Sequence, residues 1–246
     1  MGSPHSMICV NIAFVSMHDP SVNELHTFVA YSINSDTQRF TDSLTDVSIG
    51  TMSIILASAS DIRRRILEDA GVDVEVIVSG LDEKSIFRSH EDIAPGSLAR
   101  TLAREKARIV SEKHPGRITI GADQILRHRN NLLQKPVGMP GVRERLELLR
   151  GDVHTLHCAV AIARDGSIPF EHDETVLLVM RKFSNVALEE YIAYGGEALA
   201  RSVGAYCLED RGLALFERIE GNYHAALGLP VIPLLEALRT LGATSK

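Results

Sequence analysis

The chain has 246 residues, of which 45% are hydrophobic and 24% charged, so we expect a soluble globular protein with one α/β domain of roughly 190 residues plus an extension. Its net charge of −6 disfavours a nucleic-acid polymer as the main partner, because domains that bind such polymers are usually basic. No apolar run approaches the roughly 20 residues of a membrane span, and three widely spaced cysteines without a CxxC pattern predict neither a zinc site nor disulfides, which favours a cytoplasmic location.

The first 51 residues contain many polar residues and show little helical periodicity. The apolar run Met7–Val15 lacks a preceding positive region and a small-residue cleavage signal, so we do not expect a secretory signal. Gly2–Ser6 resembles a tag remnant, and Met52 stands directly before a strand pattern. We expect a poorly ordered N-terminal extension over residues 1–51 and a functional domain over 52–246. The alternative is a folded β-hairpin that covers an edge strand.

Strand-like and helix-like runs follow in the domain, separated by Gly and Pro. The pattern predicts strands at Ser53–Ala57, Val74–Ser79, Arg117–Ala122, Thr155–Ala163, Thr175–Arg181 and Leu213–Ile219. It predicts helices at Asp61–Ala70, Ser97–His114, Val142–Arg150, Ala187–Tyr194 and Pro233–Thr240. The order starts as βαβ and then becomes rich in strands, which indicates an α/β fold with a mixed sheet.

The first strand runs through small residues, including Ser58, into a helix that Ser60 can cap. The free N–H groups of a helix start bind anions, and Arg63–Arg65 add charge-assisted hydrogen bonds. The segment therefore fits a phosphate site, although it lacks the glycines of a P-loop. A solvated basic turn is an equally good interpretation.

Lys106 falls inside the apolar face of the long helix Ser97–His114, beside Leu102 and Val110. A lysine in that place either reaches the surface with its ammonium group or meets an anion. Before other observations are considered, the first alternative is the stronger one.

Asp123 follows the apolar run Ile118–Ala122, which predicts that it lies at the carboxyl end of a strand, where α/β sheets bind ligands. A carboxylate there can hold a divalent metal or accept a proton from water. The alternative is a turn or a helix cap. Lys135, in a turn downstream, is able to face the same place, and the acid pair Asp82–Glu83 follows another strand.

Cations that bind phosphate oxygens and acids that bind a divalent ion are what hydrolysis of a phosphoanhydride needs. The phosphate charges repel a nucleophile, so Arg, Lys and Mg²⁺ neutralise them while a carboxylate activates water.

In this combination the residues resemble the Maf family of nucleoside triphosphate pyrophosphatases, over about Ser53 to Leu241. The resemblance rests on Ser58, Ser60 and Arg63 of a Ser-x-Ser-x-x-Arg signature, Asp82-Glu83, Glu105-Lys106-Ala107, Gly121-Ala122-Asp123, Lys135-Pro136, and the later segments 202–206, 217–223 and 228–230. Each motif is weak alone, but their common order over most of the chain makes chance agreement implausible.

The resemblance implies a Maf/ITPase-like α/β fold, in which a curved mixed β-sheet and helices form two lobes around a central cleft. It implies hydrolysis between the α- and β-phosphates of a nucleoside triphosphate, with a divalent cation such as Mg²⁺ or Mn²⁺ as cofactor. Asp123 would be the proton acceptor, and Glu83 and Asp123 would hold the metal. Ser58, Ser60, Arg63, Lys106 and Lys135 would bind the phosphates. The resemblance also suggests a homodimer.

Three positions bear on the choice of base: Ile62, Gln124 and Glu209. Gln124 and Glu209 are similar to the family branch that takes 7-methyl-GTP, whereas Ile62 replaces the Trp of that branch and cannot stack on a base. A carboxylate at Glu209 can accept both donors of a guanine edge, and a 7-methyl base is cationic. We therefore favour 7-methyl-GTP and the removal of modified nucleotides. The alternatives are the dTTP/UTP branch and a nucleotide-binding regulator of septum formation without catalysis.

Other departures and polar residues carry no predicted role in the reaction. Asp61 stands where the family often has Pro, and an acid there weakens a phosphate site. Cys158 is expected to be a buried structural thiol. His154 and His157 are three apart, which on a strand places them on opposite faces and is poor geometry for sharing a metal. Arg127–Arg129 is expected to form a solvated hairpin tip.

Overall fold

A computed structural model describes residues 11–19, 24–32, 54–89 and 93–244. The chain divides into two units, Met1–Gly50 and Thr51–Lys246. In the first unit, strand β1 (Asn11–Asp19) pairs antiparallel with β2 (Glu24–Ser32), with Asn11 opposite Ser32. The assignment of residues 1–51 as an extension without chemistry stays a prediction.

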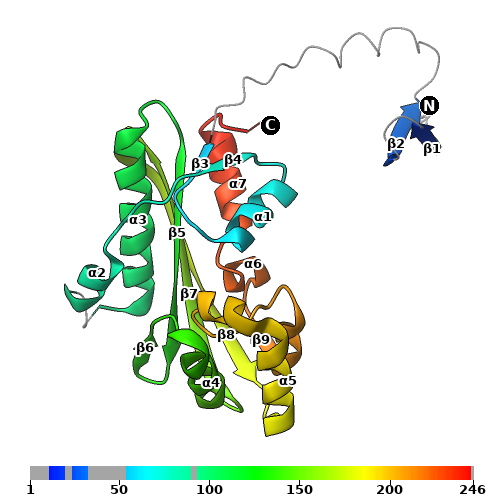
Figure 1. Cartoon of the computed structure of the whole chain (residues 1–246). Coiled ribbons are helices and arrows are strands. Elements are labelled where there is room, and N and C mark those ends of the chain that lie inside the picture. The colour runs from blue at the N-terminus through cyan, green and yellow to red at the C-terminus, as the bar shows by residue number, and fades with distance from the viewer. Residues whose placement is uncertain (1–10, 20–23, 33–53, 90–92, 245–246) are drawn as a thin grey trace, which may run out of the picture. The chain divides into compact units, whose positions relative to one another are not determined.

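The second unit is built on a mixed sheet of seven strands (Figure 1). The strands are β3 (Ile54–Leu56), β4 (Val74–Val76), β5 (Thr119–His128), β6 (Asn131–Leu133), β7 (Val153–Arg164), β8 (Ser167–Met180) and β9 (Phe216–Glu220). Their order is β4-β3-β5-β7-β8-β9, and β6 pairs with β5. β3 is parallel to β4 and β5, whereas β5, β7, β8 and β9 pair antiparallel in sequence. The expected mixed α/β sheet is confirmed.

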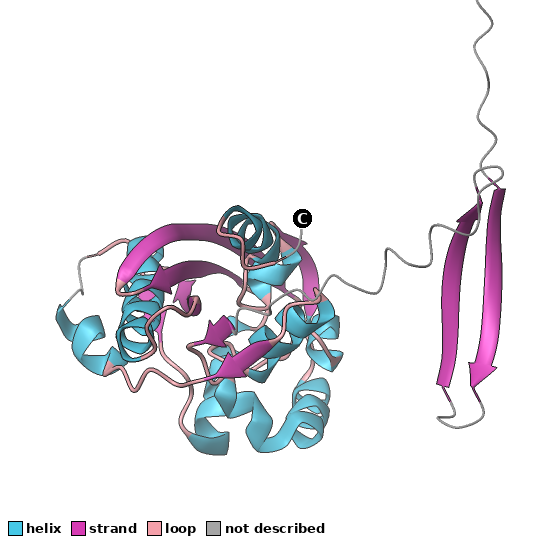
Figure 2. Cartoon of the chain, turned by 90° about the horizontal axis from the view of Figure 1, so that it is seen from above, coloured by secondary structure: helices cyan, strands magenta, loops and turns pink. Residues whose placement is uncertain are grey.

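Helices cover this sheet, which curves around the unit (Figure 2). They are α1 (Asp61–Asp69), α2 (Glu83–Ser89), α3 (Pro95–Lys113), α4 (Gly138–Leu149), α5 (Asn185–Gly195), α6 (Tyr223–Ala226) and α7 (Val231–Thr240), with 3-10 turns η1 (Gly196–Arg201) and η2 (Arg211–Leu215). In the described residues no helix combines the length and the apolar character that a membrane crossing requires.

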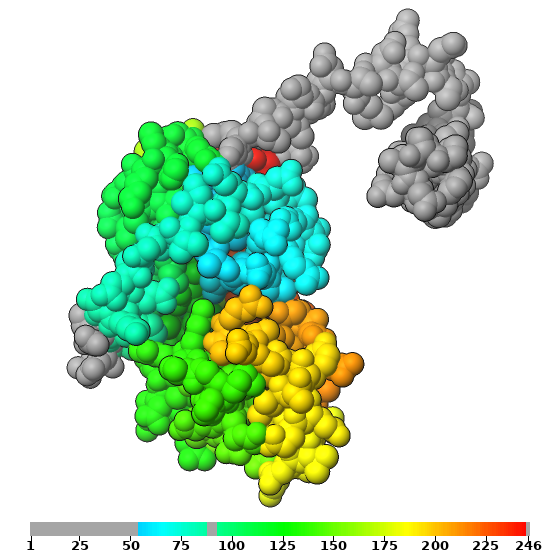
Figure 3. All heavy atoms as spheres, viewed as in Figure 1, coloured from blue at the N-terminus to red at the C-terminus, as the bar shows by residue number. Residues whose placement is uncertain are grey.

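Two large apolar clusters divide the unit into two lobes that share the long strands. The first lobe packs α1 and α7 against β3 and the amino-terminal half of β5, where Ile120 and the preceding Ile118 are buried. The second packs α4, α5 and η1 against β7, β8 and the carboxyl half of β5, where Leu126 is buried. β5 thus passes from one core into the other, and the cleft described below lies where the lobes meet (Figure 3).

Helix α3 lies close against β5 because Gly121 has no side chain. A Cβ atom on Gly121 would stand 2.2 Å from the Ala103 carbonyl oxygen and 2.6 Å from the Ala107 nitrogen. Leu98, Leu102 and Val110 of α3 are buried on this face, and Lys106 lies among them as the helical spacing predicted. The close approach brings the Lys106 ammonium group to the residues that follow Gly121.

Two predictions about β5 were wrong. Asp123 does not end the strand but lies near its middle, because the pairing with β7 continues from Asp123–Ala159 to Arg127–Thr155. The hairpin tip after β5 is present, and Arg127 and Arg129 are exposed, but the histidine between them is not. His128 is buried and lies 3.0 Å from the Asp152 carboxylate, so the tip is tied to the body of the second lobe.

Candidate active site

One cleft of about 760 Å³ collects every residue that the sequence nominated for the reaction. Its walls include the nominated phosphate, metal and specificity residues Ser58, Ser60, Ile62, Arg63, Glu83, Lys106, Asp123, Gln124, Lys135 and Glu209. These residues come from the loop between β3 and α1, from α1, α2, α3 and β5, and from two loops of the second lobe. The long-range folding of the sheet therefore brings together residues that lie up to about 150 positions apart in sequence.

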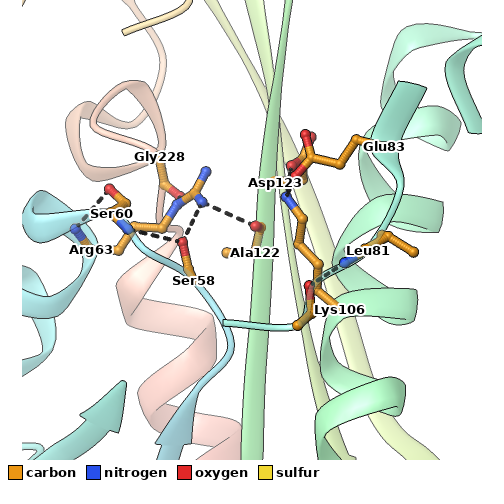
Figure 4. A network of polar contacts seen from close by, with 10 residues as sticks. Ser58, Ser60, Arg63, Leu81, Glu83, Lys106, Ala122, Asp123 and Gly228 are labelled. Carbon is orange, nitrogen blue, oxygen red and sulfur yellow. Dashed lines mark hydrogen bonds and ion pairs between the residues drawn. The ribbon is translucent and has the colours of Figure 1, made fainter. Parts of the chain in front are cut away.

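Arg63 is held on one side of β5 by neutral oxygen atoms (Figure 4). Its Nη1 donates to the Ser58 Oγ at 2.9 Å and to the Ala122 carbonyl at 3.0 Å, and its Nε donates to the Gly228 carbonyl at 2.7 Å. Ser60 caps α1 by accepting from the Arg63 backbone N–H. Because neutral groups hold the guanidinium, its positive charge is fixed in place but not cancelled, which suits an anion site.

Lys106 lies on the other side of β5 and is held by two carboxylates (Figure 4). Its Nζ forms ion pairs with Asp123 and, at 2.7 Å, with Glu83. Lys106 and Asp123 are nearly buried, whereas the Glu83 side chain is 48% exposed at the amino end of α2. With both acids ionised, this group of one lysine and two carboxylates carries one net negative charge, which favours a cation beside it.

Burial raises the pKa of the Asp123 carboxyl above its ordinary value, while the positive charges of Lys106 and Arg63 oppose the rise. A carboxyl whose pKa moves towards neutrality is a better proton acceptor, because it binds a proton more strongly than a free aspartate does. The buried Asp123 carboxyl beside Lys106 is therefore suited to act as a base.

The two nominated carboxylates fit a hard divalent ion. Across the described residues no group of three or more His, Cys, Asp or Glu side chains could hold a metal by itself. Mg²⁺ usually takes one or two carboxylates and completes its shell with water and substrate phosphate oxygens. Asp123 and Glu83, which already share one ammonium group, are a donor set of that kind.

Gln124 and Glu209 line the part of the cleft that the second lobe and α6 form. The Gln124 side-chain amide donates to the carbonyls of Ala225 at 2.9 Å and Ala226 at 3.0 Å. Because both donors are used by the backbone, only its Oε1 can face a ligand. Gln124 and Glu209 then both present acceptors to the cleft.

Several residues that are neighbours of the candidate site residues in sequence differ from them in position or contacts. Arg64 pairs with Glu68 at 3.1 Å and Arg65 is exposed, and of the three arginines only Arg63 lines the cleft. Asp82 accepts from the Ser85 backbone N–H at the start of α2 and does not line the cleft. Asp61 does line it and pairs across its mouth with Arg201 of η1, at 3.6 Å.

Sequence reasoning missed the groups that hold the nominated side chains. The carbonyls of Ala122 and Gly228 fix Arg63, and a backbone carbonyl leaves no signal in the sequence. Gly228 has a left-handed φ of +104°, and a Cβ there would stand 3.2 Å from the Arg63 Nε. A glycine ahead of the Leu-Pro pair was the only signal that could have pointed to this contact.

Known proteins resemble the domain closely. Residues 53–241 match the family described as Maf-like protein. A nucleoside triphosphate pyrophosphatase of Nitrobacter hamburgensis is 44% identical over 192 residues, which cover 78% of this chain and 95% of the relative. A protein of Caulobacter vibrioides with the same name is 44% identical over 192 residues, with 77% and 96% coverage.

A third relative is the 7-methyl-GTP pyrophosphatase of Mesorhizobium japonicum, which is 40% identical over 195 residues, covering 78% of this chain and 98% of the relative. The family match spans more than half of the chain and agrees with the motifs from which the resemblance was first drawn. This chain belongs to the Maf family.

Proposed function

We propose that the domain hydrolyses a nucleoside triphosphate between its α- and β-phosphates, giving a nucleoside monophosphate and pyrophosphate. The observation that carries this proposal is the placement of Asp123. It is a buried acid beside Lys106 and Glu83, with the fixed cation Arg63 on the opposite side of the same strand. The names of the relatives agree with this reaction.

The positively charged residues and the acid of the site have different roles in the proposed reaction. Arg63, Lys106 and Lys135 reduce the negative charge of the triphosphate, so that a nucleophile can approach phosphorus. Asp123 accepts a proton from water as the water oxygen bonds to phosphorus and the bridging P–O bond breaks. The electron pair of that bond stays on the bridging oxygen, which departs with the leaving group, so that the products are a nucleoside monophosphate and pyrophosphate.

Glu83 and Asp123 would hold the divalent cation. When bound, such an ion supplies positive charge at the phosphate oxygens and lowers the pKa of a bound water molecule. Lys106 keeps the two carboxylates together in the free protein, so the donor set is arranged before the cation arrives.

Substitution of Asp123 tests the reaction. Asp123→Asn keeps the size of the side chain but cannot accept the proton, and we expect pyrophosphate release with Mg²⁺ or Mn²⁺ to fall about 100-fold or more. The matched control is Asp173→Asn, which changes an acid that pairs with Arg100 and does not line the cleft. Equal turnover by the Asp123 variant would remove it from the role of base. Nucleotide binding by the wild type without pyrophosphate release would instead favour the non-catalytic regulator.

We further propose that the preferred substrate is 7-methyl-GTP. Guanine presents the N1–H and the amino group as adjacent donors, and the acceptors Glu209 and Gln124 Oε1 suit that edge. A thymine or uracil edge has one donor between two acceptors, so a carboxylate would meet a lone pair. One relative of the chain is named for this substrate.

Turnover of 7-methyl-GTP, GTP, dTTP and UTP by the wild type decides the substrate. Glu209→Gln should lower the preference for 7-methyl-GTP over UTP about tenfold, because a charge-assisted pair with guanine is lost. Asp210→Asn is the matched control, since Asp210 is exposed and its carboxylate bonds the Tyr194 hydroxyl outside the cleft. A wild type that prefers dTTP or UTP would assign the chain to the other branch.

A further inference from the structure

Arg145 is a half-buried cation that has no role in the reaction proposed above. It lies on α4, and its Nη2 donates to the Gln134 carbonyl at 2.9 Å while its Nη1 donates to the Val203 carbonyl. No carboxylate of the described residues forms an ion pair with it, and desolvation lowers its pKa. A charged side chain that is partly removed from water and lacks an acid partner needs the two carbonyls to compensate it.

The two carbonyls belong to loops that are far apart in sequence and meet at the cleft. Residues 134–137 form the first loop, which contains Lys135, and residues 202–209 form the second, which contains Glu209. A guanidinium is planar, and its N–H groups point in fixed directions. One side chain therefore sets the separation of the two loops as well as holding each of them.

The first contact restrains Lys135 directly. The carbonyl of Gln134 belongs to the same planar peptide unit as the Lys135 nitrogen, so holding that oxygen orients the peptide that enters Lys135. On the other side, Pro136 keeps the Lys135 backbone out of the helical region. Lys135 is thus fixed from both sides, although it lies outside any helix or strand.

The second contact holds a strained segment. Ala205 has a left-handed φ of +59°, a conformation that costs a residue with a side chain about 1–2 kcal/mol. Just before it, a Cβ on Gly204 would stand 2.2 Å from the Tyr206 ring. Such a backbone persists only where its surroundings hold it. Arg145 holds it at Val203, and His154 holds it at the Tyr206 hydroxyl, 2.8 Å away.

We propose that Arg145 is a positioning residue that clamps both loops of the cleft and thereby presents Lys135 to the triphosphate. The kinetic part of this proposal rests on the proposed function, whereas the clamp itself does not. Arg145 does not line the cleft, so its effect passes through the two carbonyls.

Hydrogen exchange of the free protein tests the clamp without reference to activity. Arg145→Met keeps most of the apolar stem and removes the donors, and we expect amide exchange in residues 134–137 and 202–209 to become about tenfold faster or more. Arg143→Met is the matched control. Arg143 is two residues away on α4, and it pairs with the exposed Glu189 instead of a loop. Unchanged exchange in both loops of the Arg145 variant would overturn the proposal.

Kinetics then test the link to Lys135. We expect Arg145→Met to lower kcat/KM about tenfold, mainly through KM, and Arg145→Lys to recover part of the loss. Lys135→Ala should lower kcat/KM much less in the Arg145→Met background than in the wild type, because a displaced Lys135 already contributes little to triphosphate binding. Losses that simply multiply would show that Arg145 does not act through Lys135.

The two experiments separate the two proposals. If the wild type releases no pyrophosphate from any nucleoside triphosphate, the proposed function fails, and the exchange rates alone decide whether the clamp exists. If the wild type is active but neither exchange nor coupling changes, the clamp fails and the proposed function stands.

Discussion

The two sides of the cleft are built differently. The strand side carries Arg63, Lys106 and Asp123 on α1, α3 and β5, and these side chains hold one another or the strand between them. The loop side carries Lys135 and Glu209 on irregular segments. Regular elements keep reacting groups in place more accurately than loops do. The acid and two of the three cations proposed for bond breaking therefore lie on regular elements, whereas Lys135 of the phosphate set and Glu209 of the base-reading pair lie on loops.

The largest effect is expected from breaking the strand side at Gly121. Gly121→Ala would place a Cβ within 2.6 Å of two backbone atoms of α3, so the helix has to move away from β5 and Lys106 with it. We expect a loss of about 3 kcal/mol in the free energy of unfolding and about 100-fold in activity. Urea unfolding and pyrophosphate release measure both. Gly96→Ala, where the nearest atom is a flexible Asp173 oxygen at 3.3 Å, is the control.

A smaller effect is expected from Arg63→Lys. A lysine has one nitrogen and cannot reach Ser58, Ala122 and Gly228 with the geometry of a guanidinium. We expect kcat/KM to fall about 10- to 100-fold while the fold persists. Arg64→Lys on the same helix should change it less than about twofold, because its pair with Glu68 is exposed. Similar losses in both variants would mean that local charge, and not the fixed guanidinium, matters.

The smallest effect is expected at the loop side of the cleft, where lowering the pH should reduce the free energy of unfolding through His154. Burial lowers the pKa of His154 to about 3, and its Nδ1 has no partner among the described residues. In the unfolded chain the His154 imidazole binds a proton near pH 6.5, whereas in the folded protein it stays neutral down to about pH 3. The free energy of unfolding therefore falls as the pH drops from about 6.5 towards 3. Between pH 7 and pH 5 this single group should cost about 1–2 kcal/mol.

The measurement is the free energy of unfolding in urea at the two pH values. His154→Gln removes the titration, keeps a polar group near Tyr206, and should lose less stability on acidification than the wild type does. His224→Gln, at an exposed histidine, should behave like the wild type. Equal acid sensitivity of all three proteins would show that His154 can be protonated in place.

The sequence predicted the elements whose pattern is local. The period of α3 correctly placed Lys106 in an apolar face, and Ser60 correctly capped α1. It failed where distant residues decide. β5 continues past Asp123 because β7 pairs with it, and β8 begins at Ser167 instead of Thr175 because its polar residues Glu171–Glu174 pair with β7 through the backbone. The short α2 and α6 have too few residues to show a period.

For the site, the motifs nominated a set of residues, and the fold brought all of them to one cleft. What could not be predicted is how they are held. Two of the three side-chain hydrogen bonds of Arg63 end on carbonyls, and both of those of Gln124 do, and a backbone carbonyl leaves no signal in the sequence. Whether the domain forms a homodimer stays a prediction of the resemblance.

The place of Asp123 within β5 has a mechanical consequence. The strand enters one core with Ile120 and the other with Leu126, so Asp123 lies at the joint between the lobes. When two arms swing about a joint, the points at the joint travel least. Any opening of the lobes would therefore displace the outer loops far more than the acid.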